Sequence, residues 1–137
     1  MKAKLRFALA LVFGSSDVLA EWVRVAENNR LVAYADTQVQ KVGKSLIVWV
    51  LFDYKAVQES RLSGRRYLSE KAQREIDCAG ERGRVLFFTW HANKMGDGVV
   101  VHTGGKPTAW EPSSSPQSIG NAFWKQFCGG ADAGRLR

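Results

Sequence analysis

The chain has 137 residues, and its 20 lysines and arginines against 13 aspartates and glutamates give a formal net charge of +7. This length suits a single domain, and a positive surface favours anionic partners such as sulfated glycans or acidic protein patches. No segment has the roughly 20 consecutive apolar residues of a membrane-spanning helix, so we expect no transmembrane anchor.

The first 20 residues have the three parts of a secretory signal peptide. Lys2, Lys4 and Arg6 precede a short apolar run at 7–13, and Ala20 is a small residue at the expected cleavage position. We therefore expect residues 1–20 to be removed. Export argues against a nucleic-acid partner, and Glu21, the expected first residue of the mature chain, is not a cysteine that could carry a lipid.

The two cysteines are Cys78 and Cys128. In an oxidising compartment, an even pair in a small domain is most simply interpreted as one disulfide. Neither cysteine lies in a CxxC or locally basic context that would favour a nucleophile.

Short runs rich in β-branched and aromatic residues alternate with turn residues along most of the chain. We predict six strands, at 22–27, 31–36, 45–54, 67–78, 85–91 and 99–102. The runs at 45–54 and 85–91 are apolar on both faces, which is typical of central strands covered on both sides. Segment 67–78 also fits helical spacing, but the β runs on either side favour a strand.

A helix is predicted near the C-terminus. Ser115 is the expected N-cap and Pro116 the expected first helical residue. An apolar stripe follows at helical spacing, and Gly129 and Gly130 are expected to end the helix. The stripe comprises Ile119, Ala122, Phe123 and Phe127, with Gln126 as its polar member.

These elements predict an α+β fold, a mainly antiparallel sheet of about six strands with a C-terminal amphipathic helix packed on it. The expected organisation is a signal peptide at 1–20, one domain at 21–130 and a flexible tail at 131–137. One short helix cannot cover both faces of two central strands. The remaining apolar surface must meet a second sheet layer, a sheet curled on itself or a second copy of the chain, which makes a homodimer possible.

Catalytic motifs are absent from the sequence. His91 and His102 lack the spacing of zinc ligands, and no serine lies in a GxSxG turn. Gly43-Lys44-Ser45 ends like a phosphate-binding loop, but Gln38 stands where its first glycine is required. We therefore expect no enzymatic activity, no metal and no cofactor.

Charged and aromatic residues supply the candidate binding positions. Basic residues cluster around the centre of the chain and, with Tyr67, could form a patch for an acidic or sulfated ligand, although ordinary solvation explains any single one. They are Arg61, Arg65, Arg66, Lys71, Arg74, Arg82 and Arg84. The nearby carboxylates Glu70, Glu75 and Asp77 are interpreted as a solvated surface.

Five tryptophans are many for this length. Trp49 and Trp90 lie in the strands that are apolar on both faces and should be core residues. Trp22 and Trp110 are expected at element edges, and Trp124 lies off the main stripe of the helix.

Taken in order, several short motifs resemble the bacterial surface-adhesin protein E family. They lie at Trp22, 34–36, 48–54, 67–69, 76–78, 95–98, 110–112, 116–118 and Cys128. The resemblance implies an antiparallel sheet with a C-terminal helix, no enzymatic activity, a tendency to dimerise and a Gram-negative source. The family's named member is a lipid-anchored outer-membrane protein that binds host extracellular-matrix proteins, whereas this chain lacks the cysteine for such an anchor.

Three functions follow for the chain. The first is a non-enzymatic adhesin of the bacterial envelope that contacts host matrix protein. The second is a soluble periplasmic binding or inhibitor protein. A small hydrolase or metal enzyme is the least favoured, because no catalytic constellation is present. The expected location is the periplasm, the cell surface or the surrounding medium.

Overall fold

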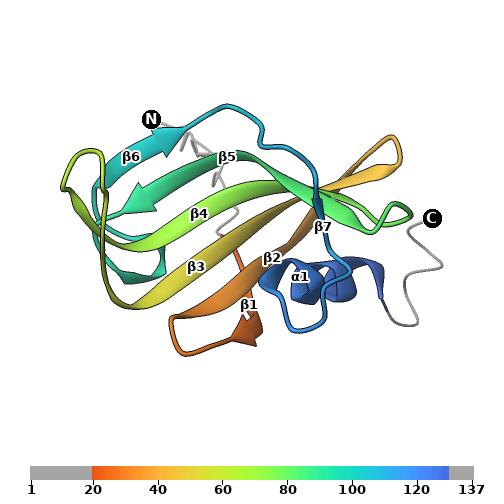
Figure 1. Ribbon diagram of the computed structural model, residues 1–137, viewed down its shortest axis with the longest axis horizontal. Coiled ribbons are helices and arrows are strands. Elements are labelled where there is room, and N and C mark those ends of the chain that lie inside the picture. Colours follow the sequence, from red (N-terminus) through yellow and green to blue (C-terminus); the bar gives the residue numbers. More distant parts are fainter. Residues whose placement is uncertain (1–19, 130–137) are drawn as a thin grey trace, which may run out of the picture.

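Consecutive strands pair as antiparallel neighbours in the computed structural model, which describes residues 20–129 (Figure 1). The sheet order is β1-β2-β3-β4-β5-β6, and a short seventh strand, β7, pairs with the start of β5. The strands are β1 Trp22–Glu27, β2 Leu31–Val42, β3 Ser45–Glu59, β4 Arg66–Asp77, β5 Arg82–His91, β6 Val100–Gly104 and β7 Glu111–Pro112. A 3₁₀ turn, η1, spans Lys94–Gly96, and the helix α1 spans Ile119–Cys128.

The predicted α+β class and the six main strands are confirmed, and segment 67–78 lies in strand β4 except for Cys78, which begins the following turn. Strands β2, β3 and β5 are longer than predicted. Their extensions are mostly polar and exposed, so hydrophobic pattern alone could not find them; they continue the hydrogen-bonded ladders of the sheet. The expected signal peptide lies outside the described residues apart from Ala20, as does the expected tail at 131–137.

The predicted start of the helix is wrong by several residues. The N-cap is Ser118, not Ser115, and its Oγ accepts a hydrogen bond from the Asn121 N–H at 3.0 Å. Gln117 has a φ of 66°, in the left-handed region, so Pro116 lies in a turn before the helix. Gly129 follows the last helical residue as predicted.

The hydrophobic core lies between α1 and one face of the sheet. The helix crosses that face and contacts β1 and β5 (Figure 1). Phe123 is 1% exposed and meets the Phe52 ring edge-on, with ring centroids 5.9 Å apart. The core also contains Ala33, Ala35, Leu46, Val48, Val50, Ala72, Ile76, Phe127 and Cys128.

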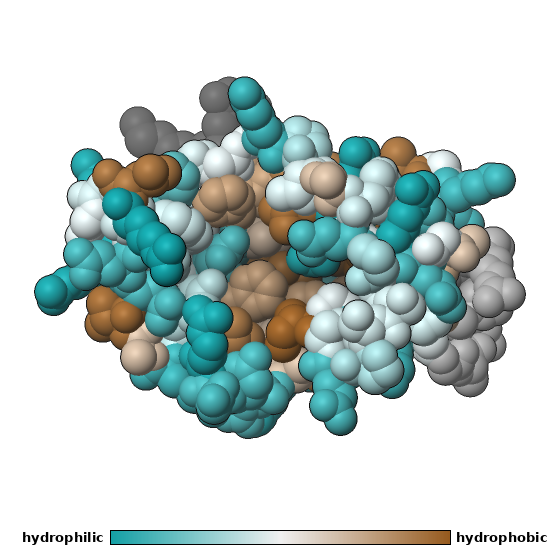
Figure 2. All heavy atoms as spheres, in the orientation of Figure 1, coloured by the Kyte–Doolittle hydropathy of each residue, from teal (hydrophilic) through white to brown (hydrophobic). Residues whose placement is uncertain are grey.

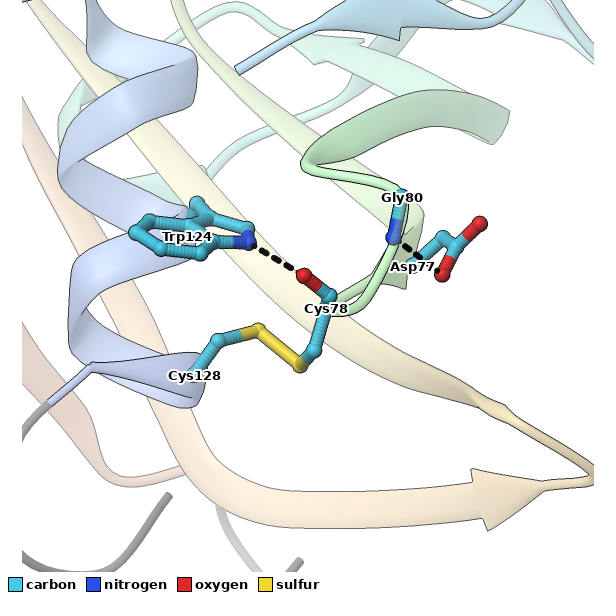
Figure 3. Close-up of a disulfide and its surroundings, with 5 residues drawn as sticks. All are labelled: Asp77, Cys78, Gly80, Trp124 and Cys128. Carbon is cyan, nitrogen blue, oxygen red and sulfur yellow. Dashed lines mark hydrogen bonds between the residues drawn. A yellow bond between two sulfur atoms is a disulfide. The ribbon is translucent and has the colours of Figure 1, made fainter. Parts of the chain in front are cut away.

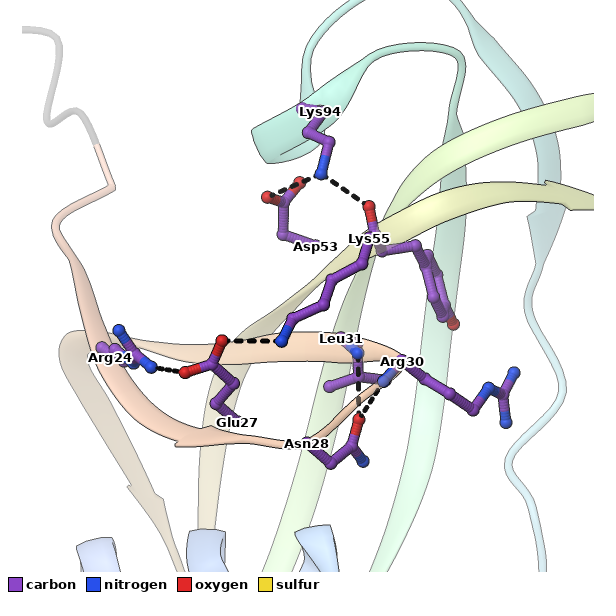
Figure 4. Close-up of polar contacts among 9 residues, drawn as sticks. Arg24, Glu27, Asn28, Arg30, Leu31, Asp53, Lys55 and Lys94 are labelled. Atoms are coloured by element: carbon purple, nitrogen blue, oxygen red, sulfur yellow. Dashed lines mark hydrogen bonds and ion pairs between the residues drawn. The ribbon is translucent and has the colours of Figure 1, made fainter.

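The turns are fixed by local polar contacts. Asn28 Oδ1 accepts from the N–H groups of Arg30 and Leu31, which closes the predicted β1–β2 turn (Figure 4). Nearby, Lys94 Nζ donates to the Tyr54 carbonyl at 2.7 Å and lies 3.8 Å from the Asp53 carboxylate. These contacts tie η1 to β3 at this end of the sheet.

Register shifts interrupt every main strand pairing, for example between Asp53 and Gln58 along β3. Such irregularities bend strands and increase their twist. Within residues 20–129, no second sheet layer covers the face opposite α1. As a result Trp49, which lies on that face and was predicted to be a core residue, is only half-buried. Trp90, also predicted to be a core residue, is half-buried on the α1 side of the sheet.

No helix among the described residues is long and apolar enough to cross a membrane.

Candidate binding surfaces

The predicted disulfide is present and joins the β4–β5 turn to the helix. Cys78 and Cys128 are bonded, with their Cα atoms 5.5 Å apart (Figure 3). One turn earlier on the helix, Trp124 Nε1 donates to the Cys78 carbonyl at 3.1 Å. The bond therefore fastens α1 to the sheet and is a structural staple.

A group of aromatic side chains lies beside α1 on the same face of the sheet. Phe52, Glu70, Trp90 and His102 are register partners across β3 to β6, and the contact of Phe52 with Phe123 places this row on the helix side. We call the group the aromatic surface; it comprises Tyr54, Tyr67, Phe88, Trp90 and His102. In the orientation of Figure 1, Figure 2 shows a hollow near the middle of the molecule with brown and tan atoms at its floor.

The rings of the aromatic surface hold one another in place. Tyr67 stacks on Trp90 with centroids 4.3 Å apart and planes within 8°, and His102 lies 4.7 Å from Trp90. Phe88 contacts both Trp90 and His102. Tyr54 is buried and meets Tyr67 edge-on, whereas His102 is exposed. This mutual packing restricts the rotation of the rings.

Glu70 lies among these rings. Its Oε2 accepts a hydrogen bond from the Tyr54 hydroxyl at 3.1 Å. Burial raises the pKa of Glu70, against the opposing effects of the Tyr54 and Trp90 hydrogen bonds and of Arg74. The prediction that Glu70 belongs to a solvated surface with Glu75 and Asp77 is therefore wrong, because the β4 register turns it toward the aromatic rings.

The seven predicted basic residues do not form one patch. Arg61 and Arg65 lie in the β3–β4 loop and Arg66 begins β4, whereas Arg82 pairs with Asp77 at the far end of that strand. A strand of this length separates the two groups by roughly 35 Å. Their role in binding stays a prediction.

The individual members also differ in environment. Arg74 lies on the α1 side, 5.6 Å from the Phe123 ring centroid, and burial lowers its pKa. Its Nε has no hydrogen-bond partner in the described part of the chain. Lys71 projects from the opposite face, beside Trp49. Sequence alone could not assign Arg74 and Lys71 to opposite faces, because it left open whether segment 67–78 is a strand or a helix.

Arg82 and Arg84 are used within the fold. They pair with Asp77 and Glu75 at 2.9 and 2.6 Å, and both guanidinium groups lie about 4.5 Å from the Trp110 ring centroid. This arrangement holds the segment before β7 against the sheet. Glu75 and Asp77 were interpreted as a solvated surface, but their side chains are only 15% and 17% exposed and each pairs with an arginine of β5.

Arg61, Arg65 and Arg66, here called the loop arginines, are exposed, and Arg66 directly precedes Tyr67 of the aromatic surface. Arg65 Nη1 donates to the Val101 carbonyl at 3.3 Å, which ties the loop to β6 next to His102. The sequence placed the loop arginines and Tyr67 in one candidate patch, whereas the rest of the aromatic surface was missed because Trp90 was assigned to the core. The alternating aromatic residues at 88 and 90, together with the ring at 102 on the next strand, were the features of the sequence that indicated this surface.

Residues 20–129 contain no group of three or more His, Cys, Asp or Glu placed to hold a metal. His91 is buried, and its Nε2 lies 2.7 Å from Thr89 Oγ1. Burial, followed by the charge of Lys71, lowers its pKa. His91 is therefore a buried residue of the packed sheet, whereas His102 is exposed on the aromatic surface.

The fold, the staple and the open aromatic surface together define a small disulfide-bonded binding module. The model of one family, surface-adhesin protein E, matches residues 22–129, so the chain belongs to that family. It is accordingly a surface adhesin, which implies export from the cell. No curated protein sequence matches the chain.

Solved structures of Haemophilus influenzae protein E share the fold. One has a TM-score of 0.63 and 14% sequence identity, covering 87% of this chain and 90% of that chain. A second crystal form gives a TM-score of 0.64 at 14% identity, with coverage of 86% and 93%. Protein E from a non-typeable strain gives 0.63 at 13% identity, with coverage of 88% and 82%. The resemblance expected from the sequence motifs is confirmed.

Proposed function

We propose that this adhesin binds a host extracellular-matrix protein through the aromatic surface and the adjoining loop arginines, without catalysing a reaction. The hydrogen bond from Arg65 to the Val101 carbonyl is the observation that carries the proposal, because it sets an arginine beside the rings of β5 and β6. Tryptophan, tyrosine and arginine are the residues enriched at the energetic centres of protein interfaces. Here all three types meet on one rigid face.

The absence of catalysis is proposed on the character of this site. Its one half-buried carboxylate, Glu70, is engaged by Tyr54, and its one exposed imidazole, His102, is packed beside Trp90. Neither is paired with a nucleophile. A fixed arrangement of rings is suited to binding a ligand of complementary shape rather than to catalysing a reaction of that ligand.

Charge reversal tests the contribution of the loop arginines. The exported protein is applied to immobilised fibronectin, laminin and collagen, and binding of the wild type is compared with that of the Arg65→Glu, Arg66→Glu double variant. We expect at least tenfold weaker binding to the matrix protein that is recognised, with a loss of salt sensitivity. The matched control, Lys41→Glu with Lys44→Glu, reverses two charges at the opposite end of the sheet and should bind like the wild type. Equal binding by both double variants would remove the loop arginines from the proposal.

We further propose that the protein reaches the cell surface. Direct adhesion requires the aromatic surface to face the host, and the family is one of surface adhesins. Protease treatment of intact cells should therefore digest the protein. Protection in intact cells, with digestion after the outer membrane is opened, would instead place it in the periplasm.

Self-association is a separate proposal. Strand β6 is an edge strand; its first residue, Val100, is 50% exposed, and Val99, which precedes it, is 71% exposed. Open edges with exposed apolar residues favour pairing with a second copy of the chain. Sedimentation equilibrium should give a dimer whose dissociation constant rises in Val100→Lys; a monomer at every concentration would contradict it.

A further inference from the structure

Two adjoining hollows lie on the face of the sheet opposite α1. The larger, of about 380 Å³, is lined by Trp22, Asp36, Gln38, Trp49 and Lys71, and by Ala20, which precedes β1 in the sequence. The smaller, of about 240 Å³, is lined in part by Gln38, Gln40, Trp49 and Gln73. Because Trp49 and Gln38 belong to both, the two form one continuous depression, here called the tryptophan hollow.

Lys71 brings a positive charge into the middle of this face. It lies on the central strand β4, half-buried, between Leu51 and Thr89 in register. A side chain on Gly96 would collide with the Lys71 methylenes, so the stem of Lys71 is packed against η1. Among the described residues its ammonium group forms no ion pair and no side-chain hydrogen bond. A half-buried charge without a partner favours an anionic ligand.

Trp49 supplies a fixed ring next to that charge. Its indole meets Phe87 edge-on, with centroids 6.2 Å apart and planes at 83°, which restricts its rotation. Trp22 lines the same hollow. The negative face of an aromatic ring attracts the weakly positive C–H groups on one side of a pyranose. The two tryptophans therefore fit a sugar ring.

Polar groups around the rings match sugar hydroxyls. The amides of Gln38, Gln40 and Gln73 each offer donors and an acceptor, and none makes a side-chain hydrogen bond to another described residue. Asp36 Oδ1 accepts from the Gln38 N–H at 3.0 Å, which leaves its other oxygen to accept from a hydroxyl group.

A polypeptide fits this face less well than a glycan. The backbone groups of β2 to β5 are engaged in the sheet ladders, so an incoming peptide finds no backbone partners here. Recognition must come from rings, amides, the Asp36 carboxylate as an acceptor of hydroxyl hydrogen bonds, and the Lys71 ammonium group for the ligand's anionic group.

We propose that the tryptophan hollow binds an anionic glycan, with a sugar ring packed on Trp49 and its carboxylate or sulfate paired with Lys71. The inference goes beyond the proposed function, because the hollow lies on the face opposite the aromatic surface and takes a different class of ligand.

The probes are three octasaccharides, from heparin, from hyaluronan and from neutral maltodextrin. The heparin probe carries both sulfate and carboxylate groups, the hyaluronan probe carries carboxylate groups alone, and the maltodextrin probe has no charge. In NMR titrations of the exported protein, heparin or hyaluronan should shift the indole N–H signals of Trp22 and Trp49 and leave those of Trp90 and Trp110 in place. The neutral probe should bind at least tenfold more weakly. Shifts at Trp90 alone, no shifts with either anionic probe, or equal binding of the neutral probe would overturn the proposal.

Variants separate recognition from folding. Lys71→Gln should weaken binding of the anionic probe about tenfold, the cost of one charge-assisted contact, and Gln38→Ala should weaken it severalfold. Lys44→Gln, a matched loss of charge outside the hollow, should have no effect. Gln38 is exposed, so its variant remains informative if Lys71→Gln fails to fold. Unchanged affinity in a folded Lys71→Gln, or in Gln38→Ala, would contradict the assignment. Matrix-protein binding by the wild type without glycan binding would sink this inference and leave the proposed function standing.

Discussion

The indole of Trp124 donates to the carbonyl of Cys78 at 3.1 Å, one helical turn from the bond between Cys78 and Cys128. The same short turn of the sheet is thus held twice by the same helix (Figure 3). The disulfide crosslinks residues 50 positions apart, and the hydrogen bond fixes how the helix is rotated against the sheet.

Removing the disulfide should lower the free energy of unfolding by about 4 kcal/mol, because the unfolded chain has more conformational entropy without the crosslink. Urea denaturation of the Cys78→Ala, Cys128→Ala variant measures this value. Wild-type protein unfolded in the presence of a reductant serves as the control and should agree. A loss below 1 kcal/mol in both would show that the staple does not carry the stability of the helix.

Trp124→Phe should cost about 1 kcal/mol, because it keeps most of the packing but leaves the Cys78 carbonyl without its donor. The effect should be smaller when the disulfide is already absent, since both contacts join the same two elements. A double-mutant cycle by urea denaturation measures the coupling. Strict additivity would mean that the two contacts act independently.

The helix start offers a matched pair of serines. Ser118→Ala should lower the free energy of unfolding by about 1 kcal/mol, because the Asn121 N–H loses its acceptor. Ser115→Ala should change it by less than about 0.5 kcal/mol, since Ser115 contributes only its backbone carbonyl to Ser118. A larger loss of unfolding free energy in Ser115→Ala than in Ser118→Ala would identify Ser115 as the N-cap.

Glu70 gives the fold a defined pH dependence. Because its pKa is raised in the folded state, the folded protein holds its proton more tightly than the unfolded chain does. Its contribution to stability is therefore lost as the pH rises from about 4.3, the ordinary glutamate pKa, through the raised value. Glu70→Gln should raise the melting temperature at pH 7, with a gain that shrinks toward pH 4.

Glu75→Gln is the control for that experiment. It neutralises a carboxylate on the same strand but breaks the contact with Arg84, so at pH 7 the melting temperature should fall slightly. Thermal scans of both variants between pH 4 and 8 make the comparison. A lower melting temperature for Glu70→Gln at pH 7 would show that its ionised form is stabilised by the aromatic surface.

Much of the fold was predictable because strand periodicity and the apolar stripe of the helix are local signals. Segment 67–78 was harder, since its leucine, alanine and isoleucine fit either period and only sheet pairing decides between them. Ser118 was missed because the left-handed backbone of Gln117, which delays the helix, has no clear sequence mark. Export predicted that Cys78 and Cys128 would pair.

The binding surfaces were less predictable because they depend on which face each side chain takes. Trp49 and Trp90 look alike in the sequence, yet Trp90 lies on the side of α1 and Trp49 on the other. The cluster of basic residues was visible, but strand length and cross-strand pairing divide it into separate environments. Which basic residues lie close together therefore depends on the tertiary structure, which the order of residues in the sequence does not show.

The central claim is that the aromatic surface is the adhesive surface, and side-chain footprinting tests it most directly. Hydroxyl-radical oxidation of the exported protein, free and bound to the matrix protein it recognises, is compared residue by residue. We predict protection of Tyr67, Trp90 and His102 on binding, with Trp22 and Trp49 unchanged. Full oxidation of Trp90 and His102 in the bound protein, with protection elsewhere, would contradict the account.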